Sequence, residues 1–130
     1  MSISILVVDD EEDVAELFKR RFRREIRNGD YAVHFALNGE EALDLLGREI
    51  EPELMLILSD INMPGMSGLE LLTHVRERMP HLPVVMITAY GDEANRTRAR
   101  GLGAAEFLTK PIDFDLLRAT IANLTGHAES

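Results

Sequence analysis

The chain has 130 residues and a formal net charge of −9; 45% of its residues are hydrophobic, 28% charged, 5% aromatic and none is cysteine. This composition indicates one globular domain, and the acidic balance argues against a nucleic-acid-binding surface. Without cysteine, disulfides and thiolate metal sites are excluded. The opening residues have neither a basic leader nor the length of a membrane span. We therefore expect residues 1–130 to form a single cytoplasmic domain, with 126–130 a frayed tail or the start of a linker.

Five short apolar runs predict strands, at residues 4–8, 31–36, 54–58, 83–87 and 106–109. Apolar residues at helical spacing predict five helices between and after them, at about 10–26, 38–50, 68–79, 92–102 and 113–124. An N-cap is expected within Asp10 to Asp13, at Asn38 and at Asp113. The helix at 92–102 has a thin apolar face, and the last helix is expected to turn Leu116, Leu117, Ile121 and Leu124 inward.

The alternation of strands and helices predicts an α/β fold with a doubly wound, five-stranded parallel sheet. A flavodoxin-like strand order of 2-1-3-4-5 is one of two common arrangements, and the hydrophobic pattern alone does not choose between them.

Polar residues follow four of the five predicted strands. Asp9 and Asp10 end the first strand, Asp60 the third, Thr88 the fourth and Lys110 the fifth. The carboxyl ends of parallel strands share one edge of the sheet, and in the order 2-1-3-4-5 the first and third strands are neighbours. Asp10 and Asp60 would then face one crevice.

Crowded carboxylates resist ionising together unless a cation offsets their charge, and Mg²⁺ is the cation that suits such hard oxygen ligands. Lys110 could neutralise an anion, and the Thr88 hydroxyl could donate to a phosphoryl oxygen. These groups together predict a phosphoryl-transfer site with Asp60 as nucleophile. An acidic pair before a helix would by itself more often be a cap, so the prediction depends on the convergence of all these residues.

Four motifs in this order resemble the receiver domain of two-component response regulators. They are Val-Val-Asp-Asp-Glu at 7–11, Ser-Asp-Ile-Asn-Met-Pro-Gly-Met-Ser-Gly at 59–68, Ile-Thr-Ala at 87–89 and Thr-Lys-Pro at 109–111. The resemblance covers essentially the whole chain. It implies a signalling switch that receives a phosphoryl group from a histidine kinase or phosphotransfer protein and catalyses only its own phosphorylation and dephosphorylation.

The resemblance also implies a role for each site residue. Asp60 would be the phosphoacceptor and Lys110 the cation that binds the phosphoryl group. Mg²⁺ would be held by Asp10, Asp60 and the backbone carbonyl of Asn62, with Asp9 completing the acidic pocket.

Thr88 and Phe107 match the switch residues of the family. The resemblance implies that Thr88 moves toward the phosphoryl group and Phe107 fills the vacated space, which changes the surface of the fourth helix, fifth strand and last helix. We expect a phosphorylation-dependent homodimer through that surface, and no contact with nucleic acid or membrane. A cis peptide bond is expected between Lys110 and Pro111, where X-Pro bonds permit it.

Two further positions bear on the lifetime of the phosphorylated form. In receiver domains the residues that match Asn62 and Tyr90 flank the path of the attacking water. Asn62 could orient that water, whereas the Tyr90 ring could either cover the site or point outward as a partner contact. If the ring is a shield, Tyr90→Ala should shorten the phosphorylated half-life severalfold.

Two other classes of function are open to the same residues. A hydrolase of the haloacid dehalogenase kind would require Asp-x-Asp, whereas this chain has Asp60-Ile61-Asn62 and, at 130 residues, no room for a cap domain. Turnover of a phosphomonoester would distinguish it. A flavodoxin-like binding module would require Ser, Thr and Gly clusters in the loops after the strands, and a bound chromophore would reveal it.

Overall fold

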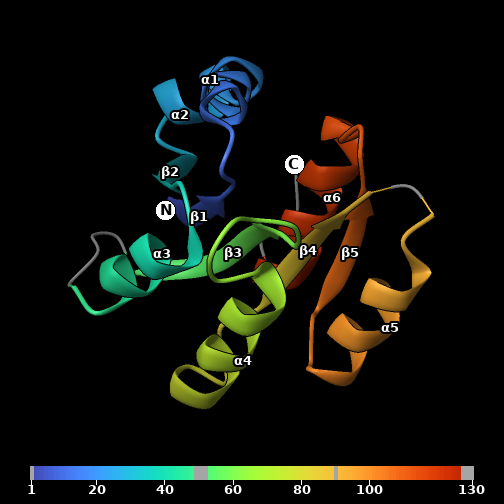
Figure 1. Ribbon diagram of the computed structural model, residues 1–130. Coiled ribbons are helices and arrows are strands. Elements are labelled where there is room, and N and C mark those ends of the chain that lie inside the picture. The colour runs from blue at the N-terminus through green and yellow to red at the C-terminus, as the bar shows by residue number, and fades with distance from the viewer. Residues whose placement is uncertain (1, 49–52, 90, 127–130) are drawn as a thin grey trace.

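The computed structural model describes residues 2–48, 53–89 and 91–126, which form one sheet with helices on both faces (Figure 1). All strand pairs are parallel, and the strands lie in the order β2-β1-β3-β4-β5. The strands are β1 (Ile3–Val8), β2 (Tyr31–Ala36), β3 (Leu54–Asp60), β4 (Val84–Thr88) and β5 (Glu106–Thr109). The predicted doubly wound α/β fold and the strand order 2-1-3-4-5 are confirmed.

The described residues form six helices. They are α1 (Glu12–Arg21), α2 (Arg23–Arg27), α3 (Gly39–Leu46), α4 (Gly68–Arg78), α5 (Glu93–Gly101) and α6 (Phe114–Thr125). Helices α1 and α6 lie on one face of the sheet and α3, α4 and α5 on the other (Figure 1). In the described parts of the chain, no helix has both the length and the apolar character needed to cross a membrane.

The first helix is divided in two, whereas the sequence predicted one helix at 10–26. The division falls at Phe22, whose φ of −104° and ψ of 17° leave the helical range. Hydrogen bonding continues across it, because the Phe22 N–H donates to the Phe18 carbonyl at 2.9 Å. The Phe22 ring is fully buried and packs edge-on against the rings of Phe18, Tyr31 and Phe114. We attribute the division to this packing, which no local repeat encodes.

Two apolar layers fix the sheet between the helices. Strand β1 is buried on both sides, with Ile5 and Val7 facing one layer and Leu6 and Val8 the other. On the α1 and α6 side, the helices contribute Phe18, Phe22, Phe114, Leu117 and Ile121. On the opposite side, they contribute Ala42, Leu69, Leu71, Leu72, Val75 and Ala99. A central strand covered on both faces has little freedom to move, so the residues at its end are held in place.

One of the residues predicted for the inward face of α6 points to solvent, whereas the rest of that face is confirmed. Leu116, expected to face inward, is 54% exposed, while Phe114, Leu117 and Ile121 are buried. The spacing of these three residues still follows one helix face. Phe114 belongs to this buried face because it packs in the aromatic cluster, with the centroid of its ring 5.2 Å from that of Phe18.

Two of the three predicted helix caps are confirmed. Asn38 and Asp113 cap α3 and α6 through their side chains. Helix α1 begins at Glu12, and its N-cap residue, Glu11, makes no side-chain cap hydrogen bond. The Asp9 carboxylate accepts from the Glu11 N–H at 2.9 Å instead. The cap predicted for α1 is therefore wrong, because the carboxylate that serves this helix start lies before the predicted span.

Helix α5 should be the most easily opened of the helices with eight or more residues. It buries only Ala99, whereas α4 buries four larger apolar side chains, each contributing about 1.5–3 kcal/mol. A helix with little buried area opens at a low free energy. Hydrogen exchange should therefore be faster at the amides of α5 than at those of α4 and α6. Equal protection of the three helices would contradict this.

Candidate functional site

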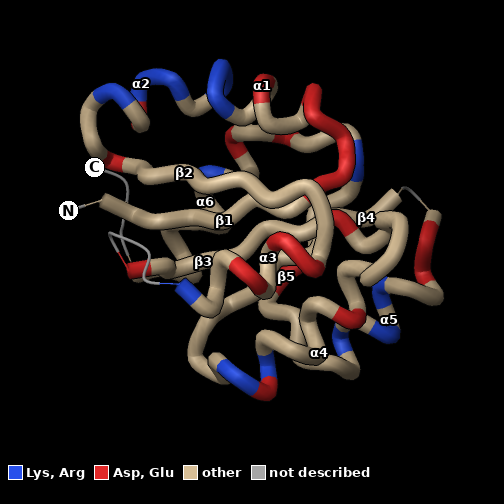
Figure 2. The backbone as a smooth tube through the Cα atoms, turned by 60° about the vertical axis from the view of Figure 1, so that its left-hand side comes forward, with Lys and Arg blue, Asp and Glu red and all other residues tan. Residues whose placement is uncertain are grey.

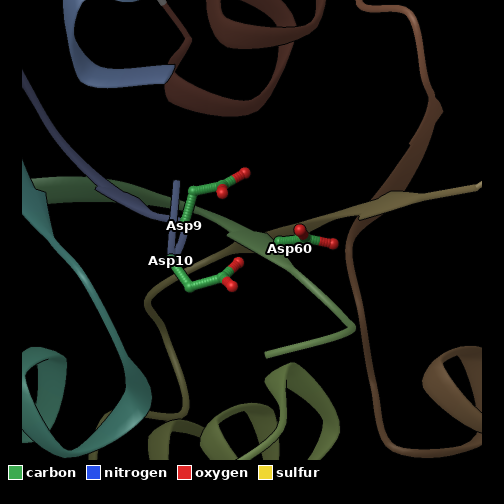
Figure 3. Close-up of side chains that lie close together, drawn as sticks. All are labelled: Asp9, Asp10 and Asp60. Atoms are coloured by element: carbon green, nitrogen blue, oxygen red, sulfur yellow. The ribbon is translucent and has the colours of Figure 1, made fainter. Parts of the chain in front are cut away.

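Three carboxylates gather at the carboxyl edge of the sheet. Asp9 and Asp10 follow β1, and Asp60 ends the neighbouring β3, as Figure 3 shows. Strand register brings them together, because Val8 pairs with Ser59, directly before Asp60. Ligand oxygens of the three carboxylates lie within 4.8 Å of one another. Asp9 and Asp60 are buried and Asp10 is exposed, so the predicted carboxylates form one cluster with Asp10 on its solvent side; we call this cluster the acidic crevice.

Both oxygens of the Asp60 carboxylate have a partner. Oδ2 accepts from the Lys110 ammonium at 2.9 Å, and Oδ1 accepts from the Asn62 backbone N–H at 3.3 Å. Lys110 follows β5, and its own N–H donates to the Thr88 carbonyl at 2.9 Å. The Lys110-Pro111 peptide bond is cis, as predicted. This hydrogen bond between the ends of β4 and β5 therefore positions the Lys110 backbone, from which the side chain extends to Asp60.

Burial and charge shift the protonation of two groups in the crevice. Burial raises the pKa of Asp9, and the negative charges of Asp60 and Asp10 raise it further, against the lowering effect of the hydrogen bond from Glu11. Burial alone would lower the pKa of Lys110. The hydrogen bond and charge of Asp60 outweigh that effect, so the pKa of Lys110 is raised. Lys110 thus offsets the charge of Asp60, whereas the raised pKa of Asp9 favours the protonated form of its carboxyl group.

Thr88 and Phe107 lie on adjacent strands beside the crevice. Thr88 is fully buried, and its hydroxyl is at the limit of hydrogen bonding, 3.5 Å from the Leu108 carbonyl. Phe107 is half-buried, with the guanidinium of Arg96 5.6 Å and that of Arg100 5.3 Å from its ring centroid. The two expected switch residues thus lie on neighbouring strands, Thr88 at the end of β4 and Phe107 in β5. Tyr90, the remaining predicted site residue, lies outside the described residues.

Gly68 is a site residue whose role the sequence did not reveal. It is the first residue of α4 and its φ is not positive, so backbone conformation does not require glycine there. A Cβ at this position would lie 2.1 Å from the Asp60 carbonyl oxygen and 2.8 Å from the Ile61 Cα. Ser59 Oγ donates to the same carbonyl at 3.0 Å. Close packing of α4 against the end of β3 therefore fixes the Asp60 backbone and requires glycine.

The loop between Asp60 and α4 has a second attachment. The Glu40 side chain, in the first turn of α3, accepts from the Met66 N–H at 3.0 Å. Gly65, next to Met66, has a φ of 73°, a backbone conformation that residues other than glycine rarely adopt. The loop that connects Asp60 to α4 is therefore also anchored to α3.

Gly68→Ala should destabilise the protein by about 2–3 kcal/mol, since the added methyl group must displace backbone. Gly101→Ala is the matched control, because it also replaces a helical glycine but meets no atom within 4 Å. Chemical denaturation should show a loss for the first variant and an unchanged or slightly higher stability for the second. Equal stability of the two variants would show that the contact at Asp60 is not tight.

Asp9→Asn should stabilise the metal-free protein at pH 7. The folded state binds the Asp9 proton more tightly than the unfolded chain, so ionisation above the unfolded pKa of about 3.9 destabilises the fold. The amide removes this charge and keeps an oxygen for the Glu11 N–H. Thermal unfolding should show a gain over wild type at pH 7 that shrinks as the pH falls toward about 4.

The control for that variant is Asp44→Asn, which removes an exposed carboxylate paired with Arg48 at 2.6 Å. This variant should gain nothing. A similar gain from both replacements would mean that the total charge of the protein, and not the crowding at the sheet edge, is responsible.

Comparison with known proteins identifies the family. A family model described as the response regulator receiver domain matches residues 5–122. The response regulator protein PilR of Pseudomonas aeruginosa is 40% identical over 120 residues, which cover 90% of this chain and 25% of that protein. The chain therefore spans about a quarter of the length of this relative.

Solved receiver domains share the fold over nearly their whole length. A response regulator receiver domain protein from Clostridium thermocellum has a TM-score of 0.85 at 28% identity, covering 95% of this chain and 94% of that one. The receiver domain of NtrX from Brucella abortus has a TM-score of 0.81 at 29% identity, covering 95% and 99%. The chain belongs to the receiver-domain family of two-component response regulators, the phosphoacceptor domains of phosphorelay signalling.

Proposed function

We propose that Asp60 accepts the phosphoryl group, with Lys110 and Mg²⁺ as counter-charges. The observation that carries this assignment is the position of the Asp60 carboxylate. It ends a strand buried on both faces, has the Lys110 ammonium 2.9 Å from one oxygen, and lies beside two further carboxylates. A nucleophile held on a rigid strand is oriented before the donor arrives.

The residues of the crevice fit a divalent cation. Asp10, Asp60 and the Asn62 backbone carbonyl would hold Mg²⁺, with Asp9 beside them. All the available donors are oxygens, and three carboxylates share the cluster with one lysine. The pKa of Asp9 is raised by burial first and by the charges of Asp60 and Asp10 in addition, and a cation would offset those charges. When bound, Mg²⁺ would supply positive charge that offsets the charge of the transferring phosphoryl group.

The chain's own groups account for the transfer itself. An Asp60 carboxylate oxygen forms the new bond to phosphorus while the bond from phosphorus to the donor breaks, and the donor leaves with that electron pair. The product is an acyl phosphate on Asp60. Lys110 pairs with the Asp60 carboxylate before transfer and would pair with an oxygen of the transferred group afterwards.

Thr88 would report the transfer to the surface. Its hydroxyl makes a hydrogen bond of 3.5 Å, which is weak enough to be exchanged for a phosphoryl oxygen. Phe107 would then fill the space that Thr88 leaves. Phosphorylation adds a charge of about −1.5 to −2, and its different contacts in the two arrangements shift an existing equilibrium between them.

The donor would be a histidine kinase or a phosphotransfer protein, since the chain belongs to the receiver family. The domain would catalyse only its own phosphorylation and dephosphorylation, as a signalling switch. The surface of α5, β5 and α6 would be the output face and form a homodimer after phosphorylation. Charges of both signs on that face, including Arg98, Arg100 and Glu106, support this choice.

Incubation with acetyl phosphate and Mg²⁺ should add one phosphoryl group, measured by intact mass. Asp60→Asn should take up none, because an amide does not form the acyl phosphate. Asp44→Asn, an exposed carboxylate remote from the crevice, is the control and should be phosphorylated as in wild type. Equal uptake by Asp60→Asn would refute the assignment.

The same samples test the metal and the homodimer. Chelation of Mg²⁺ should prevent phosphorylation, and Asp10→Asn should slow it at limiting Mg²⁺. A phosphorylation rate for Asp10→Asn equal to that of wild type would remove Asp10 from the metal site.

Sedimentation tests the homodimer. The phosphorylated protein should show an increase in mass over the unphosphorylated protein.

A further inference from the structure

Basic residues are concentrated in one short segment of an otherwise acidic chain. Residues 19–27 contain six of the 14 Lys and Arg residues and one of the 23 Asp and Glu residues. This segment therefore carries +5 and the rest of the chain −14. Figure 2 shows the basic residues over the end of α1 and over α2.

Some of these basic side chains already have partners in the fold. Lys19 pairs with Glu16 at 3.6 Å. The Arg21 guanidinium lies 4.6 Å from the centre of the Phe114 ring. Arg118, which reaches this region from α6, pairs with Glu25 at 3.4 Å. These contacts join α1 and α2 to the rest of the domain.

The other four arginines have no such role. Arg20, Arg23, Arg24 and Arg27 are exposed, and their side chains make no ion pair or hydrogen bond with any residue that the structure describes. We call these four residues the arginine patch. They border a surface hollow of about 650 Å³ whose lining also includes Arg118.

Stabilisation of helix ends does not account for the arginine patch. A cation near a helix C-terminus interacts favourably with the helix dipole, but one or two suffice, and Lys19 and Arg21 already occupy the last turn of α1. Additional like charges three and four residues apart repel one another. Four unneutralised guanidinium groups around one hollow therefore indicate an anionic partner from outside the chain.

The chemistry of the hollow favours carboxylates. Arg118 lies on its wall and already holds two of them, Glu25 at 3.4 Å and Asp115 at 3.3 Å. A guanidinium fork matches a carboxylate in a bidentate manner. The four arginines of the patch offer the same guanidinium groups to a carboxylate-bearing chain.

The charge of the remainder limits the size of the partner. A nine-residue segment in helical conformation extends about 13 Å. A long polyanion or a charged lipid surface would reach beyond it and meet the −14 of the other residues, which repels anions. A short acidic segment fits within the patch and avoids that repulsion. We propose that the arginine patch is a docking surface for a short acidic segment of a protein partner.

The location of the patch permits docking during phosphoryl transfer. Helix α1 begins next to the acidic crevice and runs back along the sheet, and α2 leads into the start of β2. The patch is therefore at the opposite edge of the sheet from Asp60. A segment bound there leaves the Asp60 edge open, so docking does not depend on the role proposed for Asp60.

A fluorescently labelled hexaglutamate peptide is the probe. Its anisotropy should rise on addition of the wild-type protein at low salt and should rise less as ionic strength increases. The triple variant Arg20→Gln, Arg23→Gln, Arg27→Gln should bind at least tenfold more weakly. Glutamine keeps the helical propensity, and the replaced side chains are exposed, so circular dichroism should show an unchanged fold.

The matched control replaces three exposed arginines elsewhere, as Arg48→Gln, Arg78→Gln, Arg98→Gln. It changes the net charge by the same amount and should alter peptide affinity less than twofold. An equal loss in both triple variants would overturn the proposal, because net charge would then explain the binding. Absence of peptide binding to the wild-type protein would also overturn it.

Two further probes test the class of partner. Duplex DNA and phosphatidylglycerol-containing vesicles should bind more weakly than hexaglutamate at the same salt concentration. Tighter, patch-dependent binding of either would replace the acidic segment with that partner. Asp60→Asn should bind hexaglutamate as wild type does, so a failure of the phosphoacceptor assignment would leave this result unaffected.

Discussion

Repulsion among three carboxylates at the end of β1 and β3 is the constraint on which the domain depends. Asp9, Asp10 and Asp60 lie within 4.8 Å of one another, and among the described residues one ammonium, that of Lys110, pairs with them. The core opposes this repulsion, because both strands are buried between two apolar layers. The free energy of packing thus keeps the three carboxylates close together in spite of their mutual repulsion.

The strands and the site were predictable because both arise from short-range patterns. A run of apolar residues identifies a strand buried on both faces, and its first polar residue marks the strand end. Asp60 and Lys110 are the first charged residues after such runs. Parallel order then brings strand ends to one edge, so a one-dimensional pattern predicted a three-dimensional cluster. The order itself needed the family resemblance, since the pattern permitted two.

The features that were missed depend on contacts between distant segments. The division at Phe22 and the inward position of Phe114 in place of Leu116 both accompany the packing of the Phe22 and Phe114 rings against each other. Gly68 has an ordinary backbone conformation. The need for glycine at this position arises only because α4 packs against the Asp60 carbonyl. Helical spacing and turn propensities describe neighbours along the chain, so they contain no information about these approaches.

Helix α1 separates two regions of opposite charge, and this separation limits how the domain can transmit its signal. The helix has ten residues and is about 15 Å long, whereas charges in physiological salt are screened over about 8 Å. A charge added at Asp60 would therefore interact only weakly with the arginine patch, and docking there would be insensitive to phosphorylation. Any phosphorylation-dependent output must instead be carried by packing, through side chains next to Asp60 that move. Thr88 and Phe107, on the strands beside it, have the position that this requires.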